Sequence, residues 1–175
     1  MSGALLHKLR SLRFRDILSH LKPEWVDLAV FVARLGSCEP KALAKVEIVI
    51  EKVSTPSRLT YKALIGGREV HRSLVRSFRL RNLQLGFGKG PVIESCFTAS
   101  EYRGLHIYPQ VLNHILLDLQ ATTAAVEVYI WADPENASSI AGMERAGFEF
   151  VARCKGLCLG PFIVNRSREY RRDGK

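Results

Sequence analysis

The 175-residue sequence contains no long hydrophobic run. Its longest unbroken apolar stretches, such as residues 28–33 and 128–132, reach about six residues. A membrane-spanning helix needs ~20, so none is predicted, and the first residues lack the apolar core of a secretory signal. Cysteine is also scarce, because four residues in a chain of this length do not make a disulfide framework. We therefore expect a protein of the reducing cytoplasm.

Acidic residues are few relative to basic ones. The chain has 17 Asp and Glu against 26 Lys and Arg, a net charge of +9, while its 47% apolar and 25% charged residues are typical of globular proteins. The length suits one domain. The positive charge favours an anionic partner, which could be nucleic acid, an acidic membrane or a phosphate-bearing small molecule.

Three segments hold the excess charge: residues 1–22, 68–90 and 165–175. The first predicts a basic helix over residues 3–21, with apolar side chains on two roughly opposite faces. Such a helix either lies on an anionic membrane or docks on its own domain, and the split faces favour docking. Contact of residues 3–21 with an anionic membrane or with a partner stays open as the alternative.

The second basic segment predicts half of a β-hairpin that turns at Gly66 and Gly67. Its arginines either line a groove for an acidic ligand or form a solvated strand face: Arg72, Arg76, Arg79 and Arg81. The basic tail, residues 166–175, is predicted to be frayed and solvated. Tyr170 is its only aromatic residue, so nucleic-acid binding is not favoured.

The hydrophobic pattern predicts a single α+β domain over residues 23–165. A meander of strands at 26–34, 45–53, 59–65 and 69–78 precedes strands at 91–98, 125–132, 148–152 and 159–164. Helices are predicted at 109–119, with Pro109 in the first position, and from a cap at Asp133 to residue 146. Gly147 ends the second of these helices.

Residues 98–108 carry the clearest chemical signal, because there the chain leaves a strand, turns and enters a helix. A turn of this kind presents free backbone N–H groups at a helix N-terminus, where the helix dipole adds positive potential. The result is an anion site suited to a pyrophosphate, to which Arg103 can add a bidentate contact. A plain strand-to-helix turn is the structural alternative.

This stretch resembles the pyrophosphate loop of the GNAT (GCN5-related) N-acyltransferases, Gln/Arg-x-x-Gly-x-Gly/Ala. A second resemblance starts at Asn136 and ends at Gly147-Phe148, like the family's Asn-x-x-Ala/Ser helix and following strand. The two matches cover roughly residues 91–155. The resemblance implies a mixed, mostly antiparallel sheet of about six or seven strands, splayed between two parallel strands at 93–98 and 126–131 and flanked by helices.

The resemblance also implies an activity, the transfer of an acyl group, most often acetyl, from acetyl-CoA to an amine. The amine attacks the thioester directly, through an oxyanion held by a backbone N–H. No metal is expected, the acceptor could be acidic or sugar-like, and the chain could act as a monomer or a homodimer. The expected acetyl-CoA contacts are Cys96, Phe97, Thr98, Arg103, Gly104, Leu105, His106, Ile107, Tyr108, Asn136 and Ser139.

Two departures from the family pattern affect this expectation. His106 and Tyr108 stand where the loop motif has glycine, so a positive φ there would add strain. Met143 stands where the family often has a tyrosine that protonates the leaving thiolate. Tyr108 or a water could replace that tyrosine, and a catalytically silent fold that binds acyl-CoA or a partner is the alternative function.

A base helps to deprotonate the acceptor amine, which is largely protonated at neutral pH. Glu94 is the first candidate, because alternate spacing along a strand would place it on the same side as Cys96 and Thr98. His71 is the second. Cys154 and Cys158 are predicted to be packed thiols, because one Cys-x3-Cys pair is a poor zinc site.

Overall fold

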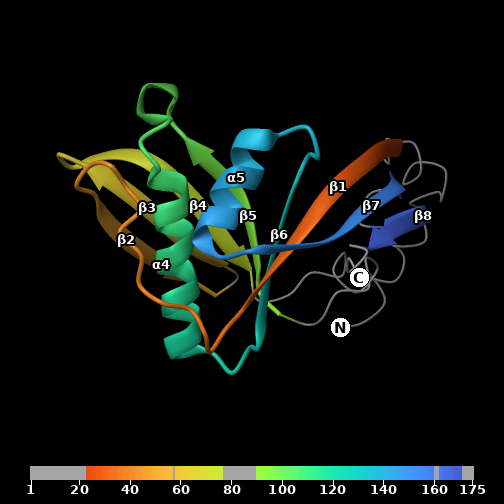
Figure 1. Cartoon of the computed structure of the whole chain (residues 1–175), viewed down its shortest axis with the longest axis horizontal. Coiled ribbons are helices and arrows are strands. Elements are labelled where there is room, and N and C mark those ends of the chain that lie inside the picture. Colours follow the sequence, from red (N-terminus) through yellow and green to blue (C-terminus); the bar gives the residue numbers. More distant parts are fainter. Residues whose placement is uncertain (1–22, 57, 77–89, 160–161, 171–175) are drawn as a thin grey trace, which may run out of the picture.

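The computed structural model describes residues 23–56, 58–76, 90–159 and 162–170. They form one sheet of eight strands in the order β2-β3-β4-β5-β6-β1-β7-β8, with two α-helices and one 3₁₀ helix (Figure 1). The predicted helix at residues 3–21 lies outside the described residues, as do Arg79 and Arg81. The elements are β1 (Pro23–Arg34), β2 (Val49–Thr55), β3 (Arg58–Ile65), β4 (Arg68–Arg76), β5 (Val92–Thr98), η1 (Ser100–Tyr102), α4 (Ile107–Thr122), β6 (Glu127–Ala132), α5 (Ala137–Ala146), β7 (Glu149–Leu159) and β8 (Phe162–Tyr170).

The α+β class is confirmed, and so is the pattern of a mostly antiparallel sheet with one parallel pair. β5 and β6 form that pair, and every other neighbouring pair is antiparallel. The placement of β1 was wrong in the predicted meander, since β1 lies between β6 and β7 rather than beside β2. Strands on both sides bury the apolar run of β1 there. A strand in a meander has the same local pattern, so the pattern does not identify the neighbours of β1.

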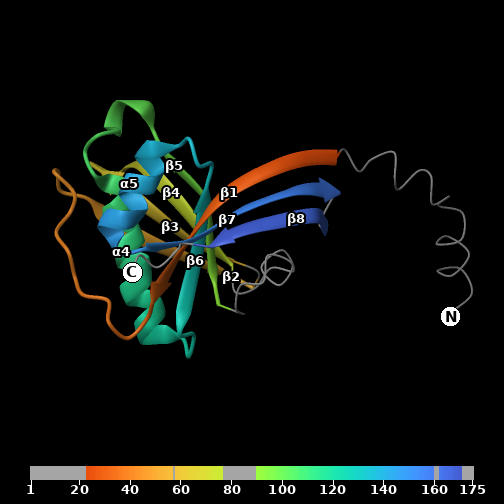
Figure 2. The ribbon, with the colours of Figure 1, turned by 45° about the vertical axis from the view of Figure 1, so that its right-hand side comes forward.

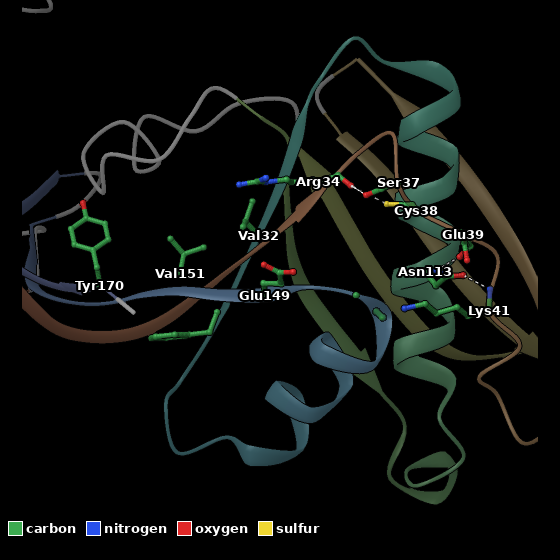
Figure 3. A pocket seen from close by; sticks show the side chains of 13 residues that line it. Val32, Arg34, Ser37, Cys38, Glu39, Lys41, Asn113, Glu149, Val151 and Tyr170 are labelled. Atoms are coloured by element: carbon green, nitrogen blue, oxygen red, sulfur yellow. Dashed lines mark hydrogen bonds between the residues drawn. The ribbon is translucent and has the colours of Figure 1, made fainter. Parts of the chain in front are cut away.

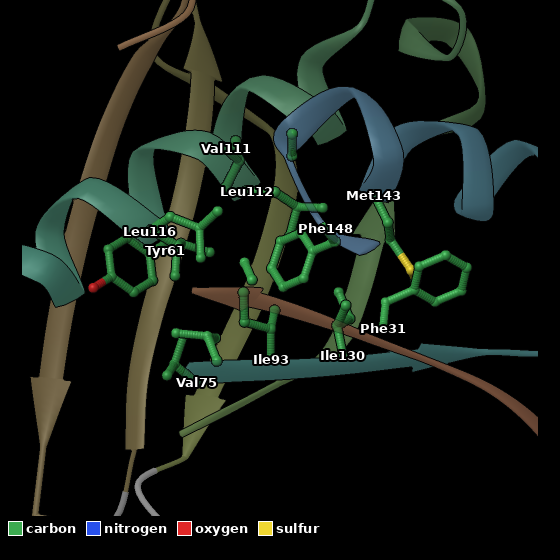
Figure 4. Packing of buried hydrophobic residues seen from close by; sticks show 14 of the residues in the cluster. Phe31, Tyr61, Val75, Ile93, Val111, Leu112, Leu116, Ile130, Met143 and Phe148 are labelled. Carbon is green, nitrogen blue, oxygen red and sulfur yellow. The ribbon is translucent and has the colours of Figure 1, made fainter. Parts of the chain in front are cut away.

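Both helices cover one face of the sheet, and the main core lies between the two layers. α4 contributes a continuous apolar stripe that includes Val111, Leu112 and Leu116. Figure 4 shows these side chains facing Tyr61, Ile93 and Ile130 from the strands. No helix among the described residues has the length and apolar character required to cross a bilayer.

A second apolar cluster lies on the opposite face of the sheet, where neither α4 nor α5 packs. Its buried members are Val30, Val92, Tyr129, Ala152, Cys154 and Cys158. Cys154 and Cys158 are buried thiols that form no disulfide, as predicted. β1, β7 and β8 extend from the body of the molecule on this side as a three-stranded arm (Figure 2).

Several element boundaries differ from the sequence-based prediction. α4 begins at Ile107, so Pro109 occupies the third helical position, where a missing N–H is still tolerated in the first turn. α5 is capped by Asn136 rather than Asp133, because the Asn136 side chain accepts the Ser139 N–H. β8 continues to Tyr170, so residues 167–170 of the predicted tail pair with β7 and are not frayed. An edge strand needs no apolar alternation to form such a ladder.

Candidate functional site

β5 and β6 touch at a single point and then diverge. Their only register pair is Val92 with Tyr129, next to a hydrogen bond of 3.0 Å from the Tyr129 N–H to the Pro91 carbonyl. Gly90 permits this close approach, because a Cβ there would lie 2.1 Å from the Glu127 carbonyl oxygen. Figure 1 shows the two strands separating beyond this point, with α5 above the gap. The splay expected between two parallel strands is therefore present.

A backbone irregularity in β5 contributes to the divergence. Ser95 has φ +52°, a left-handed conformation that is uncommon for a residue other than glycine. The register with β4 shifts at this point, so that Leu74 faces Glu94 while Arg72 faces Phe97. The extra residue forms a β-bulge, which bends the strand and changes which face its later side chains occupy.

A pocket of about 530 Å³ lies at the open end of the splay. Its walls come from the end of β5, the loop before α4, the first turn of α4 and one face of α5. Most of the predicted acetyl-CoA contacts line it, but Leu105 does not, because it packs against the main core. The predicted residues in its lining are His71, Cys96, Phe97, Thr98, Arg103, Gly104, His106, Ile107, Tyr108, Asn136 and Ser139.

The loop before α4 presents a row of backbone N–H groups. Gly104 (φ +77°) and His106 (φ +58°) are both left-handed, so the strain expected at His106 is present. Within the described residues, no hydrogen-bond acceptor takes the N–H of residues 104–108. These donors lie at the N-terminus of α4, where the helix dipole favours a negative charge.

Two arginines add charge at the rim of the pocket. The Arg103 Nε donates to the Thr98 carbonyl oxygen (3.2 Å), which fixes the base of its side chain and leaves the terminal guanidinium nitrogens available. Arg145, in the last turn of α5, lies 3.4 Å from His106 Nε2. Sequence reasoning missed Arg145. Its spacing from Ser138 and Ala141 on one helical face was the available signal.

The wall of the pocket contains a chain of polar side chains from β4 and β5. His71 Nδ1 lies 2.7 Å from Thr98 Oγ1, and its Nε2 lies 2.8 Å from Ser73 Oγ. Ser73 in turn donates to Cys96 Sγ at 3.2 Å. Burial lowers the pKa of His71 to about 4, against a smaller opposing effect of Glu69, and raises the pKa of Cys96 to about 11. Both groups are therefore neutral near pH 7.

Tyr108 continues this chain toward α5. Its hydroxyl lies 3.4 Å from Ser139 Oγ, and the Cys96 thiol is its neighbour on the other side. Burial raises the pKa of Tyr108 far above its ordinary value. The ring packs on His71, with centroids 5.7 Å apart, and fits against Gly142, where a Cβ would lie 2.6 Å from a ring carbon. Gly142 therefore makes room for this position of the tyrosine.

Asn136 has a structural task that sequence reasoning did not assign to it. Its Oδ1 accepts the Ser139 N–H (3.1 Å) and the Ser138 hydroxyl (3.0 Å), which together cap α5. The side chain still lines the pocket. Asn136 is therefore both the start of the helix and part of the pocket wall.

Glu94 does not share a face with Cys96, so the alternation that placed both in one cleft was wrong. The bulge at Ser95 reverses the alternation, and Glu94 lies on the face of the sheet opposite α4. Its mostly buried carboxylate accepts from Arg76 Nε at 2.5 Å. Arg76 and Arg72 are both paired, the latter with Glu69, rather than lining a groove.

Met143 is buried in the main core and does not line the pocket. It is 1% exposed and packs near Phe31 and Ile130 (Figure 4). Tyr108 is thus the hydroxyl group that faces the pocket near Ser139. No group of three or more His, Cys, Asp or Glu side chains among the described residues is arranged to hold a metal ion.

A larger cavity, about 740 Å³, lies between the loop after β1, the end of α5 and β7 (Figure 3). Its buried polar side chain is Asn113, whose amide is already satisfied. Oδ1 accepts the Lys41 N–H (3.0 Å) and Nδ2 donates to the Glu39 carbonyl oxygen (3.0 Å). The Asn113 amide thus ties the loop after β1 to α4.

Two solved structures are similar to part of this chain. A protein from Novosphingobium aromaticivorans assigned to the GNAT family of acetyltransferases is 14% identical, with a TM-score of 0.48, and the match covers 73% of this chain and 62% of that protein. A conserved protein of unknown function from Staphylococcus epidermidis is 12% identical, with a TM-score of 0.49, and the coverage is 86% and 64%. The chain thus spans less than two thirds of either protein. No protein-family model and no curated protein matches it.

Proposed function

We propose that this protein is an acyl-CoA-dependent N-acyltransferase of the GNAT type, with acetyl-CoA as the acyl donor and an amine as the acceptor. The observation that carries the proposal is the junction of two features in one pocket. Parallel strands diverge at its base, and the start of α4 in its lining carries a row of N–H groups that have no acceptor among the described residues. Each feature alone is common, whereas together they match a pantetheine arm that ends in a pyrophosphate.

The residues present fit such a ligand. The N–H groups of residues 104–108 would hold the pyrophosphate, and Arg103 and Arg145 would add charge-assisted contacts at the rim. The side of β5 that faces the gap would offer backbone groups of residues 96–98 to the pantetheine amides. Acetyl-CoA would supply the activated acyl group as a thioester.

The candidate acid and base in the pocket are both neutral side chains. Tyr108 is the candidate acid, because its hydroxyl faces the pocket and its raised pKa keeps that hydroxyl protonated near pH 7. His71 is the candidate to take part in proton removal from the acceptor, since it is uncharged near pH 7 and lines the same pocket. Glu94 is not a candidate base in this pocket, because it lies on the opposite face of the sheet and pairs with Arg76.

Calorimetric titration with acetyl-CoA tests the binding half of the proposal. We expect saturable binding in the micromolar to millimolar range that weakens in Arg145→Gln. Arg153→Gln is the matched control, because Arg153 pairs with Asp27 on the arm formed by β1, β7 and β8. An absence of binding at millimolar acetyl-CoA contradicts the proposal.

Thiol release from acetyl-CoA over a panel of amines tests the catalytic half. The panel includes acidic acceptors and amino sugars. Turnover with any amine supports the enzyme over its alternative, a silent fold that binds acyl-CoA. That alternative is motivated by Met143, which lies in the core where the family often has its acid. Binding without turnover would favour the silent fold.

Membrane contact through residues 3–21 remains a separate hypothesis. It is compatible with either function, because the pocket is formed by residues after 70. Flotation with anionic liposomes, compared between the full chain and a chain lacking residues 1–22, is the relevant measurement. Equal flotation of both chains would exclude the helix as an anchor.

A further inference from the structure

The polar chain in the pocket wall is continuous from one side of the pocket to the other. It runs from Thr98 through His71 and Ser73 to Cys96 and Tyr108, and its first three steps span 2.7, 2.8 and 3.2 Å. Tyr108 is the neighbour of Cys96 on the pocket side and completes it, while Cys96 Sγ lies 3.9 Å from the Glu94 carbonyl oxygen. Thr98 and Tyr108, its two ends, both line the pocket, while Ser73 is fully buried.

The hydrogen atoms along this chain can be assigned in one direction. Ser73 has a single hydroxyl hydrogen, which it donates to Cys96. Ser73 Oγ must therefore accept from His71 Nε2–H. A neutral imidazole has only one N–H, so Nδ1 accepts from the Thr98 hydroxyl.

His71 can pass a proton without becoming charged. Its burial strongly disfavours the imidazolium form, and Glu69 is the carboxylate that acts on it in the opposite sense. Tautomer exchange avoids that cost, because Nδ1 gains a proton from Thr98 as Nε2 gives one to Ser73. Cys96 and Tyr108, the other titratable groups of the chain, also stay neutral under this exchange.

Tyr108 requires such a source of protons if it is the acid. Its anion is disfavoured by burial and by its contact with Cys96. A phenolate formed in the pocket must therefore regain a proton in the same step. Cys96 is the neighbouring group that can supply it once its S–H turns away from the Glu94 carbonyl oxygen, 3.9 Å distant, and Ser73 restores the proton of Cys96 in turn.

We propose that Thr98, His71, Ser73, Cys96 and Tyr108 relay a proton from the acceptor nitrogen to the leaving sulfur, an inference that rests on the proposed acyl transfer. As the N–C bond forms, the nitrogen loses a proton to Thr98 Oγ1. As the C–S bond breaks, its electron pair remains on sulfur and takes the Tyr108 hydroxyl proton. Every group between loses one proton and gains one, and His71 ends as the other tautomer.

Substitutions that remove one hydroxyl test the relay. Thr98→Val keeps the size of the side chain, and Ser73→Ala removes the inner hydroxyl. We expect each to lower kcat about 100-fold, with the acetyl-CoA Kd from calorimetry unchanged and with activity restored in Thr98→Ser. Tyr61→Phe is the control, because it removes a buried hydroxyl outside the pocket and should leave kcat unchanged.

Two further measurements separate a relay from a structural role. In mixtures of H₂O and D₂O, the rate of the wild type should depend on the deuterium fraction along a curve, which indicates several protons in flight, and Thr98→Val should give a straight line. Nitrogen NMR should show the Nε2–H tautomer of His71 from pH 5 to 9. The acceptor in the rate measurements is the amine that the panel shows to react fastest. If no amine reacts, the rate is that of thioester hydrolysis by water under single-turnover conditions.

The outcomes are distinct for the relay and for the proposed function. Wild-type rates in Thr98→Val and Ser73→Ala, or an Nδ1–H tautomer in the resting protein, overturn the relay and leave the acyltransferase standing. A wild type that binds acetyl-CoA but never cleaves the thioester overturns the relay together with catalysis. The relay predicts an unchanged acetyl-CoA Kd in Thr98→Val. Loss of acetyl-CoA binding in this variant would therefore contradict the relay and assign the lower activity to a damaged pocket.

Discussion

Two tyrosines pack against histidines along α4, Tyr61 fully buried and Tyr108 half-buried beside the pocket, and their surroundings differ. Toward the C-terminal end, Tyr61 meets His114 edge to face, with centroids 6.2 Å apart. At the N-terminal end, Tyr108 meets His71 at 5.7 Å with a tilt of 35°. Burial raises the pKa of both tyrosines well above its ordinary value.

The two hydroxyls have different kinds of partner. The Tyr61 hydroxyl donates to Asp118 at 2.5 Å, and Lys52 holds the same carboxylate at 2.6 Å, so every charge is paired. Among the described residues, the Tyr108 hydroxyl has Ser139 Oγ at 3.4 Å and the neighbouring Cys96 thiol beside it, and the residue lines a pocket. A saturated charged network stabilises the fold, whereas a neutral, loosely bonded one can exchange protons with a ligand.

The largest effect should come from the pH dependence of stability at the pocket end. The pKa of His71 falls from 6.5 to about 4 on folding. Between these values the unfolded chain binds a proton that the native chain excludes, so the free energy of unfolding decreases as pH falls from 6.5 to 4. The loss amounts to about 3 kcal/mol and is absent above pH 6.5.

Urea unfolding of the wild type and of His71→Gln at pH 7.5, 5.5 and 4.5 measures this effect. The variant should start less stable and lose less stability on acidification than the wild type. Equal slopes for the two proteins in this window would contradict the assignment of a neutral, buried His71.

Tyr108→Phe should lower kcat about 100-fold, equivalent to about 2.7 kcal/mol, with little change in stability. The ring still fills its place against Gly142 and His71, while the hydroxyl that faces the pocket is lost. Thiol release and thermal unfolding are measured on the same preparation. A variant with wild-type kcat would remove Tyr108 as the acid.

Tyr61→Phe should show the reverse pattern at the other end of α4. Loss of the hydrogen bond to the Asp118 carboxylate should reduce the free energy of unfolding by about 1.5 kcal/mol, because Lys52 still pairs with that carboxylate. Turnover should be unchanged. Impaired turnover with normal stability would mean that the two ends of the helix are coupled.

Arg145→Gln should have the smallest effect, about 1 kcal/mol, which is roughly a fivefold increase in the acetyl-CoA Kd. Arg145 lies at the exposed rim near His106, so the solvent screens its charge. The difference between variant and wild type should shrink as the salt concentration rises, which calorimetry at two ionic strengths can show. A salt-independent difference would argue against an electrostatic role.

The sequence predicted much of the sheet and the location of the pocket. The strand–turn–helix at residues 98–108 and the segment from Asn136 to Phe148 identified the loop and the helix that line it. Sequence reasoning failed for Glu94, because a single left-handed residue, Ser95, changes the alternation of a strand. It also failed for β1, because strand pairing over long separations leaves no local pattern.

The sequence by itself determined which segments form strands and helices, and that a turn with Gly104 enters α4, since these depend on local periodicity and on glycine's freedom at positive φ. Only the tertiary structure decided which polar groups meet. Thr98, His71, Ser73 and Cys96 come from two strands whose register a bulge sets, and Tyr108 reaches them because Gly142 on α5 leaves room for its ring. Register and close packing are properties of paired elements, so no single segment encodes them.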